Sequence, residues 1–312
     1  MSLPVLIRKT VPLVNPQTGE QVYDAKTKKP TTQNIVYVNP AKRYVIPYWL
    51  PTDPHVVTVP ANQNSGPIPM KIDQSTGHFE IFYFEAKSDG PFTFTIFDEG
   101  HRVYLMNRPV HVNTVTGDGR QPFILPETMF INVARGTRQL TVVLYDLSGQ
   151  ENDIEFVCVG RRFMYKDAPV EIFSDFFEYY GDKERSTLFM LTTEEPILQL
   201  AGGASVDIEF RVTSDSFFEV MKMTRATCPE NADFEMLLRE FGSGKSFSPE
   251  NSPVNGSLQW GDGNFPHILP ESYLFERDYR ILGTLTNLEN VPVNYYFTMT
   301  GRRIKYPEEV SR

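Results

Sequence analysis

An eleven-residue stretch occurs twice in this chain, and it constrains the possible fold more than any other feature of the sequence. Residues 117–127 read GDGRQPFILPE and residues 261–271 read GDGNFPHILPE, so eight of the eleven positions are identical. A shorter stretch, GRRFMY at residues 160–165, returns as GRRIKY at residues 301–306. Two markers that recur in the same order at nearly the same spacing indicate an internal duplication. The chain is therefore expected to contain two copies of one structural unit.

The residues that both copies share are interpreted as a structural motif, and no catalytic role is assigned to them. They comprise the Gly-Asp-Gly and Pro-Glu of the first marker and the Gly-Arg-Arg of the second. The motif consists of Gly117, Asp118, Gly119, Pro126, Glu127, Gly160, Arg161 and Arg162 in the first copy and of Gly261, Asp262, Gly263, Pro270, Glu271, Gly301, Arg302 and Arg303 in the second.

The markers divide the 312 residues into five segments. These are an N-terminal arm (1–42), a first unit (43–165), a linker (166–185), a second unit (186–306) and a C-terminal tail (307–312). Each unit is long enough to enclose a hydrophobic core of its own.

Within each unit, short apolar runs alternate with turn residues. Phe92, Phe94 and Ile96 occupy alternate positions and share one face of an expected strand. Similar runs recur along both units, separated by many of the 24 prolines and 20 glycines. This pattern predicts an all-β fold made of two tandem antiparallel β-sandwiches of the jelly-roll kind.

Two segments depart from this pattern. In the linker, Phe173, Phe176 and Tyr180 recur at the spacing of one helix face, so a short helix is expected at the joint between the units. Residues 233–241 fit a short helix or a strand equally well, and the sequence does not decide between them.

The N-terminal arm is rich in polar and turn-forming residues and has little periodic apolar content. Such a composition allows an unstructured terminus, or an extended arm that becomes ordered against a neighbouring subunit. In the second case the apolar run at residues 35–38 would anchor the arm.

The balance of charges limits the possible partners. The formal net charge is −9, and a chain this acidic repels phosphate backbones, so general nucleic-acid binding is not expected. No signal peptide and no membrane-spanning run are recognisable, and Cys158 and Cys228 have no zinc-site spacing. We expect a protein that is made in a reducing cytoplasm and has no membrane span.

The Gly-Asp-Gly of each first marker is interpreted as a tight turn in which the aspartate accepts hydrogen bonds from local backbone amides. A phosphate-binding loop would need further glycines and a following helix, and a calcium loop would need more acidic residues. Glu127 and Glu271 accompany the arginines of the Gly-Arg-Arg strands. A buried Glu–Arg pair in each unit is one explanation, and solvated charges at strand ends are the other.

Other chemistry finds little support in the residue patterns. The five histidines form no ligand-spaced pair, and no Gly-x-Ser-x-Gly nucleophile motif occurs. No metal, cofactor or catalytic residue is therefore assigned. Abundant carboxylates leave a hydrolase on a sandwich scaffold open. Exposed aromatics near Trp49 and Trp260 leave a carbohydrate-binding or adhesion module open.

Two tandem copies with these markers, together with a polar N-terminal arm, resemble bacteriophage virion proteins. Over residues 43–306 the resemblance is to jelly-roll or β-sandwich components of head surfaces, collars or vertices. It implies a non-enzymatic structural protein of the virion, made in the host cytoplasm, that forms homo-oligomers and contacts other virion proteins. A double jelly-roll major capsid protein is the alternative, but its halves usually retain little sequence similarity. The visible similarity here favours a collar, vertex or decoration component.

Overall fold

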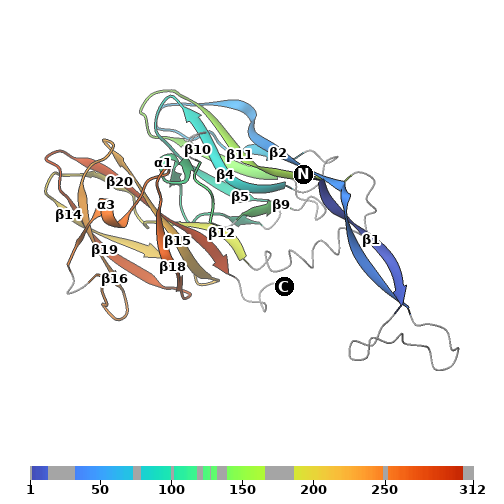
Figure 1. Cartoon of the computed structure of the whole chain (residues 1–312). Helices are drawn as coiled ribbons and strands as arrows, with labels where there is room; N and C mark the ends of the chain where they lie inside the picture. The colour runs from blue at the N-terminus through green and yellow to red at the C-terminus, as the bar shows by residue number, and fades with distance from the viewer. Residues whose placement is uncertain are drawn as a thin grey trace.

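In a computed structural model of the protein, the described residues are 2–12, 32–72, 79–99, 102–117, 122–126, 128–131, 139–165, 186–248 and 252–304. Most of these residues lie in strands, which form four sheets. Two sheets belong to the first half of the chain and two to the second, and each half encloses a hydrophobic core. The predicted all-β sandwich fold is thereby confirmed (Figure 1).

The elements of the first half are β1 (Ser2–Pro12), β2 (Thr32–Val59), β3 (Ile68–Lys71), β4 (Phe79–Ser88), β5 (Phe92–Asp98), β6 (Val103–Tyr104), β7 (Val110–His111), α1 (Val112–Val115), β8 (Thr116–Gly117), β9 (Met129–Ile131), β10 (Gln139–Asp146) and β11 (Asn152–Tyr165). One sheet has the order β1-β2-β11-β4-β8, and β9 also pairs with β4. The other has the order β3-β10-β5-β6, and β7 also pairs with β5.

The elements of the second half are β12 (Ser186–Thr192), β13 (Ile197–Leu200), β14 (Ser205–Arg211), β15 (Phe217–Cys228), β16 (Phe234–Glu240), β17 (Val254–Asn255), α3 (Gly256–Gln259), β18 (His267–Phe275), β19 (Arg280–Asn287) and β20 (Val293–Ile304). One sheet has the order β12-β20-β15-β18, and β13 also pairs with β20. The other has the order β14-β19-β16-β17.

The strand order of the second half repeats that of the first. The run β2-β11-β4-β9 corresponds to β12-β20-β15-β18, and the run β3-β10-β5-β7 corresponds to β14-β19-β16-β17. The short helices α1 and α3 follow β7 and β17 at equivalent places. The duplication that is visible in the sequence therefore extends to the topology of the sheets.

The structure differs from the expectations at several elements. Residues 234–240, which the sequence left open, form strand β16. The sequence did not predict α1 and α3, because four residues are too few to show helical periodicity. Strands β4 and β8 pair in parallel, so the sheets are not purely antiparallel. The linker (166–185), for which a helix was expected, and the tail (307–312) lie outside the described residues.

Each core is built from aromatic side chains that its two sheets direct toward each other. In the first half, the rings of Phe94 on β5 and Phe156 on β11 have centroids 4.8 Å apart. Phe84 on β4 stacks on the same Phe156 ring at 5.7 Å. In the second half, the Trp260 and Phe297 rings lie 4.9 Å apart. These rings are fully buried, and each such side chain contributes about 2–3 kcal/mol of burial free energy.

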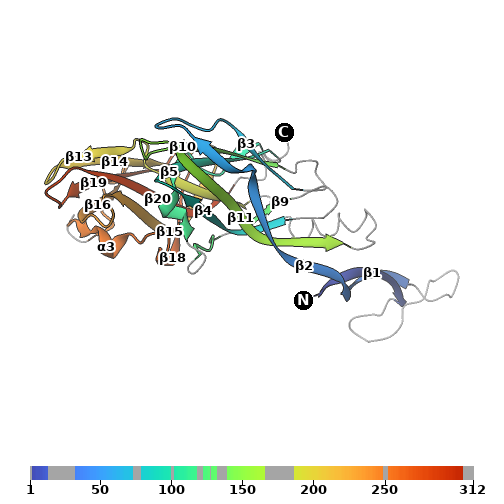
Figure 2. The same ribbon diagram turned by 90° about the horizontal axis from the view of Figure 1, so that it is seen from above.

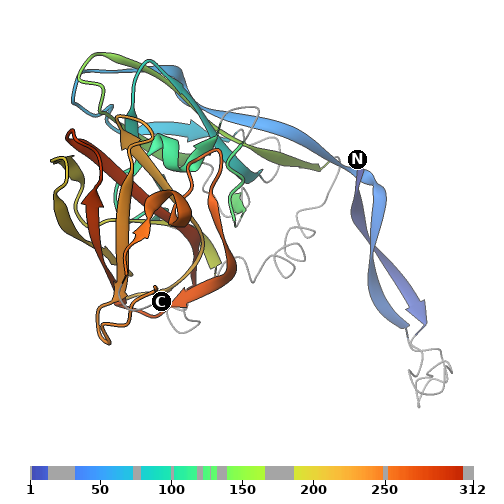
Figure 3. The same cartoon turned by 60° about the vertical axis from the view of Figure 1, so that its left-hand side comes forward.

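The N-terminal arm is a two-stranded hairpin. β1 and the first part of β2 pair antiparallel, from Ser2 opposite Tyr44 to Pro12 opposite Thr32. The hairpin projects away from the two sandwiches (Figures 1 and 3). β2 then continues along β11, so one strand belongs both to the arm and to the first sandwich (Figure 2). The extended arm expected from the sequence is thus a pair of strands.

The glycine of each Gly-Arg-Arg marker lies where two strands approach closely. Gly160 on β11 and Gly301 on β20 each lie beside a register shift in the neighbouring strand. A Cβ atom at Gly160 would lie 1.9 Å from the carbonyl oxygen of Glu80, and one at Gly301 would lie 1.9 Å from that of Glu219. Only a residue without a side chain fits such a site. This explains the glycine in both markers.

The first arginine of each marker forms an ion pair with a glutamate directly across the sheet. Arg161 Nε donates to Glu80 Oε2 at 2.8 Å, and Glu80 is 3% exposed. Arg302 Nε donates to the equivalent glutamate, Glu219. The cross-strand register places the members of each pair opposite each other. Each pair therefore joins two neighbouring strands of one sheet by a charge-assisted hydrogen bond.

The second arginine of each marker stacks on an aromatic ring. The Arg162 guanidinium carbon lies 4.6 Å from the centroid of the Tyr48 ring. The Arg303 guanidinium carbon lies 4.8 Å from that of Phe189. Both arginines are almost fully buried, which makes such cation–π contacts stronger than at the surface. The three residues of the marker thus have the same three roles in both halves.

In the second half, the partner of the first marker arginine differs from the one considered in the sequence. Glu271 is exposed on β18, and Glu219 pairs with Arg302 in its place. Glu127 lies outside the described residues. The expectation for Glu271 is wrong because strand register, and not proximity to a marker, decides which glutamate faces the arginine.

We expect Glu219→Ala to cost about 2 kcal/mol of unfolding free energy, because it removes a charged acceptor from Arg302 and from Ser272. Glu271→Ala should change the unfolding free energy by less than about 0.5 kcal/mol, because the Glu271 side chain is exposed. Urea unfolding followed by tryptophan fluorescence measures both. Equal losses in the two variants would contradict the assignment.

Candidate functional site

The two halves of the chain meet along a seam, and β12 lies at its centre. Alternate side chains of a strand point to opposite faces. Phe189 and Leu191 join the core of the second half, whereas Leu188 and Met190 join the core of the first. The backbone amide of Met190 also donates to the carbonyl oxygen of Leu105 at 2.9 Å. One strand thus belongs to two cores, and separating the halves would expose it.

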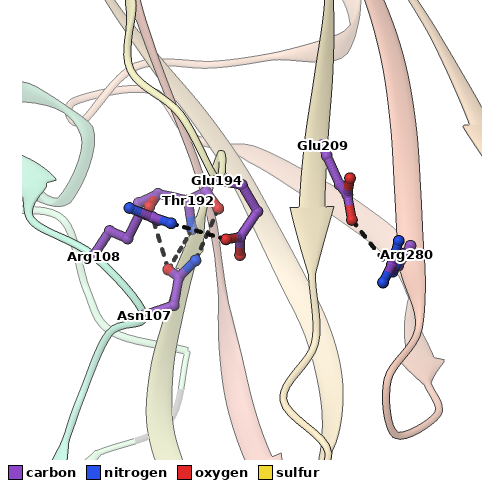
Figure 4. A network of polar contacts seen from close by, with 6 residues as sticks. All are labelled: Asn107, Arg108, Thr192, Glu194, Glu209 and Arg280. Carbon is purple, nitrogen blue, oxygen red and sulfur yellow. Dashed lines mark hydrogen bonds and ion pairs between the residues drawn. The ribbon is translucent and has the colours of Figure 1, made fainter.

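Polar side chains fix the register of the two halves next to this strand (Figure 4). The amide nitrogen of Thr192 donates to Asn107 Oδ1 at 2.8 Å, and Asn107 Nδ2 donates to the carbonyl oxygen of Thr192 at 3.0 Å. The Asn107 side chain therefore pairs with the backbone as another strand would. One residue after Asn107 and two residues after Thr192, the Arg108 Nη2 and Glu194 Oε2 atoms form an ion pair at 3.0 Å. This pair is half-exposed and adds little to stability.

Helix α1 extends the seam onto the β15–β20 sheet. The hydroxyl oxygens of Thr114 and Thr298 lie 2.9 Å apart, and both side chains are buried. The amide nitrogen of Gly263 donates to the carbonyl oxygen of Asn113 at 2.9 Å. A Cβ atom at Gly263 would lie 2.4 Å from the carbonyl oxygen of Thr116. The glycine of the second Gly-Asp-Gly is therefore required by contact with the other half.

Lys222 on β15 ties the first marker to the second half. Its Nζ donates to the carbonyl oxygen of Ile124 and lies 4.7 Å from the centroid of the Phe123 ring. Burial lowers the pKa of Lys222 below its ordinary value. Phe123 and Ile124 belong to the first copy of the Gly-Asp-Gly marker, and Gly263 belongs to its second copy. Both copies of the marker thus lie at the seam.

Cavities also open along the seam. One of about 380 Å³ is lined by residues of both halves, including Arg108, His111, Tyr145 and Tyr296. Another, of about 340 Å³, lies near Asp262 and the end of α1. Among the residues that the structure describes, no group of three or more His, Cys, Asp or Glu side chains could hold a metal ion. No helix within the described ranges is long and apolar enough to cross a membrane.

A buried histidine lies between the two halves. The His111 ring packs against the Tyr296 ring, with centroids 4.4 Å apart. Its Nδ1 accepts from the amide nitrogen of Asn113 at 3.2 Å. Burial lowers the pKa of His111 to about 4 and raises the pKa of Tyr296 to about 12. Both rings are therefore uncharged at neutral pH.

Acid should weaken the protein through His111. Its pKa lies below the ordinary 6.5, so the unfolded chain binds a proton that the folded chain excludes. The stabilisation is complete above pH 6.5 and is lost as the pH falls toward 4, by roughly 3 kcal/mol. His111→Asn keeps a capping acceptor, as Asn255 provides at α3, and removes the titration. Urea unfolding at stepped pH should show a flatter acid limb in the variant, and an unchanged limb would contradict the assignment.

The predicted turn at the Gly-Asp-Gly marker is present in the second copy. Asp262 Oδ1 accepts from the amide nitrogens of Asn264 at 2.8 Å and Phe265 at 2.7 Å. A Cβ atom at Gly261 would lie 2.0 Å from the carbonyl oxygen of Phe265. Asp118 and Gly119, the equivalent residues of the first copy, lie outside the described residues.

The remaining marker residues lie apart from one another. Gly117 ends β8 beside Glu85 of β4. Pro126 is half-buried, and Pro270 is exposed on β18. The described motif residues therefore lie partly at the seam and partly on strands β8, β11, β18 and β20. They do not meet in one pocket.

The two tryptophans considered for carbohydrate binding have different environments. Trp260 is 1% exposed and stacks against Phe210 in the core of the second half. The expectation that Trp260 belongs to an exposed aromatic surface is therefore wrong. It is the C-cap residue of α3, and its backbone amide donates to the carbonyl oxygen of Gly256. Trp49 is 55% exposed. A carbohydrate site would retain Trp49 alone of the two.

The role of β12 was missed in the sequence, although a signal was present. Residues 188–191 read LFML, without the polar alternation of a strand that has one solvated face. A continuous apolar run is typical of a strand buried on both faces.

Comparisons with known proteins do not identify a family. No protein-family model matches the chain, and no curated protein matches it in sequence. Among solved structures, the glycosylasparaginase PNGase F from Flavobacterium meningosepticum aligns over 96% of both chains, with a TM-score of 0.28 and 9% identity. A chain of Sulfolobus turreted icosahedral virus aligns over 96% of this chain and 90% of its own, with a TM-score of 0.24 and 9% identity. A triple jelly-roll protein of an archaeal virus turret aligns over 97% and 76%, with a TM-score of 0.23 and 8% identity. TM-scores this low establish neither a shared activity nor a shared role.

Proposed function

We propose that the chain is a non-enzymatic structural protein that assembles with copies of itself, and with other proteins, into a viral particle. The observation that carries the proposal is the exposed edge of the second half. β18 is the last strand of its sheet in the described part of the chain. On it, Ile268, Tyr273 and Leu274 are 65%, 47% and 52% exposed. A nine-residue edge strand with apolar side chains is a site for contact with another protein.

The N-terminal arm supports the same role. A two-stranded hairpin is at best marginally stable in water by itself. Among the described strands, β1 pairs only with β2, at the outer end of the sheet order. A surface on a neighbouring chain would supply the contacts that the hairpin lacks. Arms of this kind suit repeated contacts in a symmetric assembly.

Two tandem sandwiches, a projecting arm and a net negative charge support the proposed place in a virion. We place the protein at the head surface, collar or vertex of a phage particle, with the major capsid protein as the alternative position. The net charge of −9 argues against a role on packaged nucleic acid, because phosphate repels it.

Sedimentation velocity of the full chain over a range of concentrations tests this proposal. We expect species heavier than the 35.7 kDa of one chain, and rings or particles by electron microscopy of the same sample. A mass of 35.7 kDa at every concentration, with no assembled objects on the grids, would overturn the proposal.

A further inference from the structure

We infer that the seam between the two halves is repeated between copies of the chain, so that the second half of one copy binds the first half of the next. This inference rests on the proposed function and names the partner and the surfaces. In the seam, the first half contributes a surface formed by residues 105–114 and 122–125. We call it the head surface of the chain, a term that is unrelated to the head of a phage particle. The second half contributes a tail surface, formed by β12, the outer face of β20, Lys222 and residues 261–263. Because the halves are copies, the first half also has a tail surface and the second half also has a head surface.

The sequence offset between the copies identifies the equivalent tail residues. Tyr48 and Phe189, which are 141 positions apart, have the same role beneath the marker arginines. The following residues, Trp49 and Met190, pair with Val159 and Thr300, which are also 141 positions apart. Trp49 therefore occupies in the first half the position that Met190 occupies in the second.

These two equivalent residues differ in what covers them. Met190 is fully buried, because the head surface of the first half packs over it. Trp49 is 55% exposed, and it is a larger apolar residue than the methionine. Trp49 thus lies at a position that is the centre of a contact in the second half. Tryptophan is one of the residue types that contribute most of the binding energy at interfaces. The tail surface of the first half is thus available for a second copy.

The head surface of the second half is equally available. α3 begins 144 positions after α1, and both helices have the same cap, in which His111 or Asn255 accepts from the amide two residues later. Thr114, the third residue of α1, is fully buried in the seam. Leu258, the third residue of α3, is 72% exposed. The head surface of the second half therefore has an exposed leucine at the position where the first half has a buried threonine.

The pairs that would meet between copies are chemically compatible. In the seam, Thr114 contacts Thr298, and the equivalent pair between copies is Leu258 with Val157. A hydroxyl pair is thus replaced by two apolar side chains. Val157 is half-buried on β11, next to the strand that carries Trp49. The junction between copies would bury Trp49 and Leu258, two of the most exposed apolar side chains of the described structure.

Each copy offers one head and one tail, so the contact is heterologous. Repetition of a heterologous contact gives a closed ring if the rotation between units closes, and a filament if it does not. Symmetric pairing of two like surfaces would join at most two copies. We therefore expect that an assembly of more than two chains needs both surfaces on each chain.

Two single variants test this, each of which damages one surface. Trp49→Asp removes the free tail and keeps the free head, whereas Leu258→Asp removes the free head and keeps the free tail. Each alone should remain at 35.7 kDa under conditions where the wild type assembles, with self-association weakened about 30-fold or more. An equimolar mixture should form a complex of two chains and nothing larger, because one good head meets one good tail. Phe241→Asp, at a residue that is also 55% exposed but lies outside both surfaces, should assemble like the wild type.

The outcomes separate this inference from the proposed function. If the wild type assembles and both variants assemble as well, the inference is overturned and the structural role stands. If the single variants stay monomeric but their mixture does too, the head-to-tail pairing is overturned. If the wild type itself stays at 35.7 kDa, the proposed function fails, and with it the inference. Thermal unfolding of each variant confirms that its fold is intact.

Discussion

Gly301→Ala is expected to unfold the protein or to cost about 4 kcal/mol or more of its unfolding free energy. The added Cβ would lie 1.9 Å from the carbonyl oxygen of Glu219, which belongs to the backbone of the neighbouring strand and cannot rotate away. Relief would require β15 and β20 to separate at the bulge where they pair, together with loss of the adjacent Arg302–Glu219 contact. Damage of this size by a single methyl group arises only from steric conflict in a packed core.

Urea unfolding measured by fluorescence and circular dichroism gives the free energy. Gly242→Ala is the matched control, because no atom lies within 4 Å of a Cβ at that position and its stability should change by less than about 0.5 kcal/mol. Gly160→Ala should reproduce the large loss in the first half, where the equivalent distance is also 1.9 Å. If Gly301→Ala unfolds like the control, the close approach of the strands does not exist.

Met190→Asp is expected to have a comparable effect through the seam. Met190 is fully buried in the core of the first half although it belongs to a strand of the second. A carboxylate there would be desolvated with no cation to pair with it among the neighbours described for this core, at a cost of about 4 kcal/mol or more. Because β12 belongs to both cores, we also expect the two halves of the wild type to unfold in one transition.

Trp49→Asp is the matched control for Met190→Asp, since it makes the equivalent substitution on the exposed copy of the same strand. Its unfolding free energy should change by less than about 1 kcal/mol, while its assembly is lost. The comparison separates a contact needed for folding from one needed for association. If Met190→Asp melts at the wild-type temperature, β12 does not bridge the two cores.

Much of the fold could be predicted because it depends on local patterns. The repeated markers revealed the two copies, and the alternation of Phe92, Phe94 and Ile96 revealed a strand with one face in the core. The turn at Asp262 followed from its flanking glycines. Each of these signals lies within a few residues, where backbone geometry alone determines the result.

The seam and the ion pairs could not be predicted, because they depend on register and on contacts between distant segments. Glu219 is 83 residues from Arg302, and only the pairing of β15 with β20 brings them together. Trp260 and Trp49 look alike in the sequence, yet Trp260 is buried in the core and Trp49 faces outward. Position in the sandwich, and not residue type, separates a core side chain from an interface side chain.

A cryo-electron microscopy map of the assembled wild-type protein tests the central claim most directly. We expect neighbouring copies to meet with Trp49 of one chain buried against the α3 end of the next. We also expect this junction to superimpose on the seam around Met190 within each chain. A map in which Trp49 and Leu258 face solvent while the copies meet through other surfaces would contradict this claim.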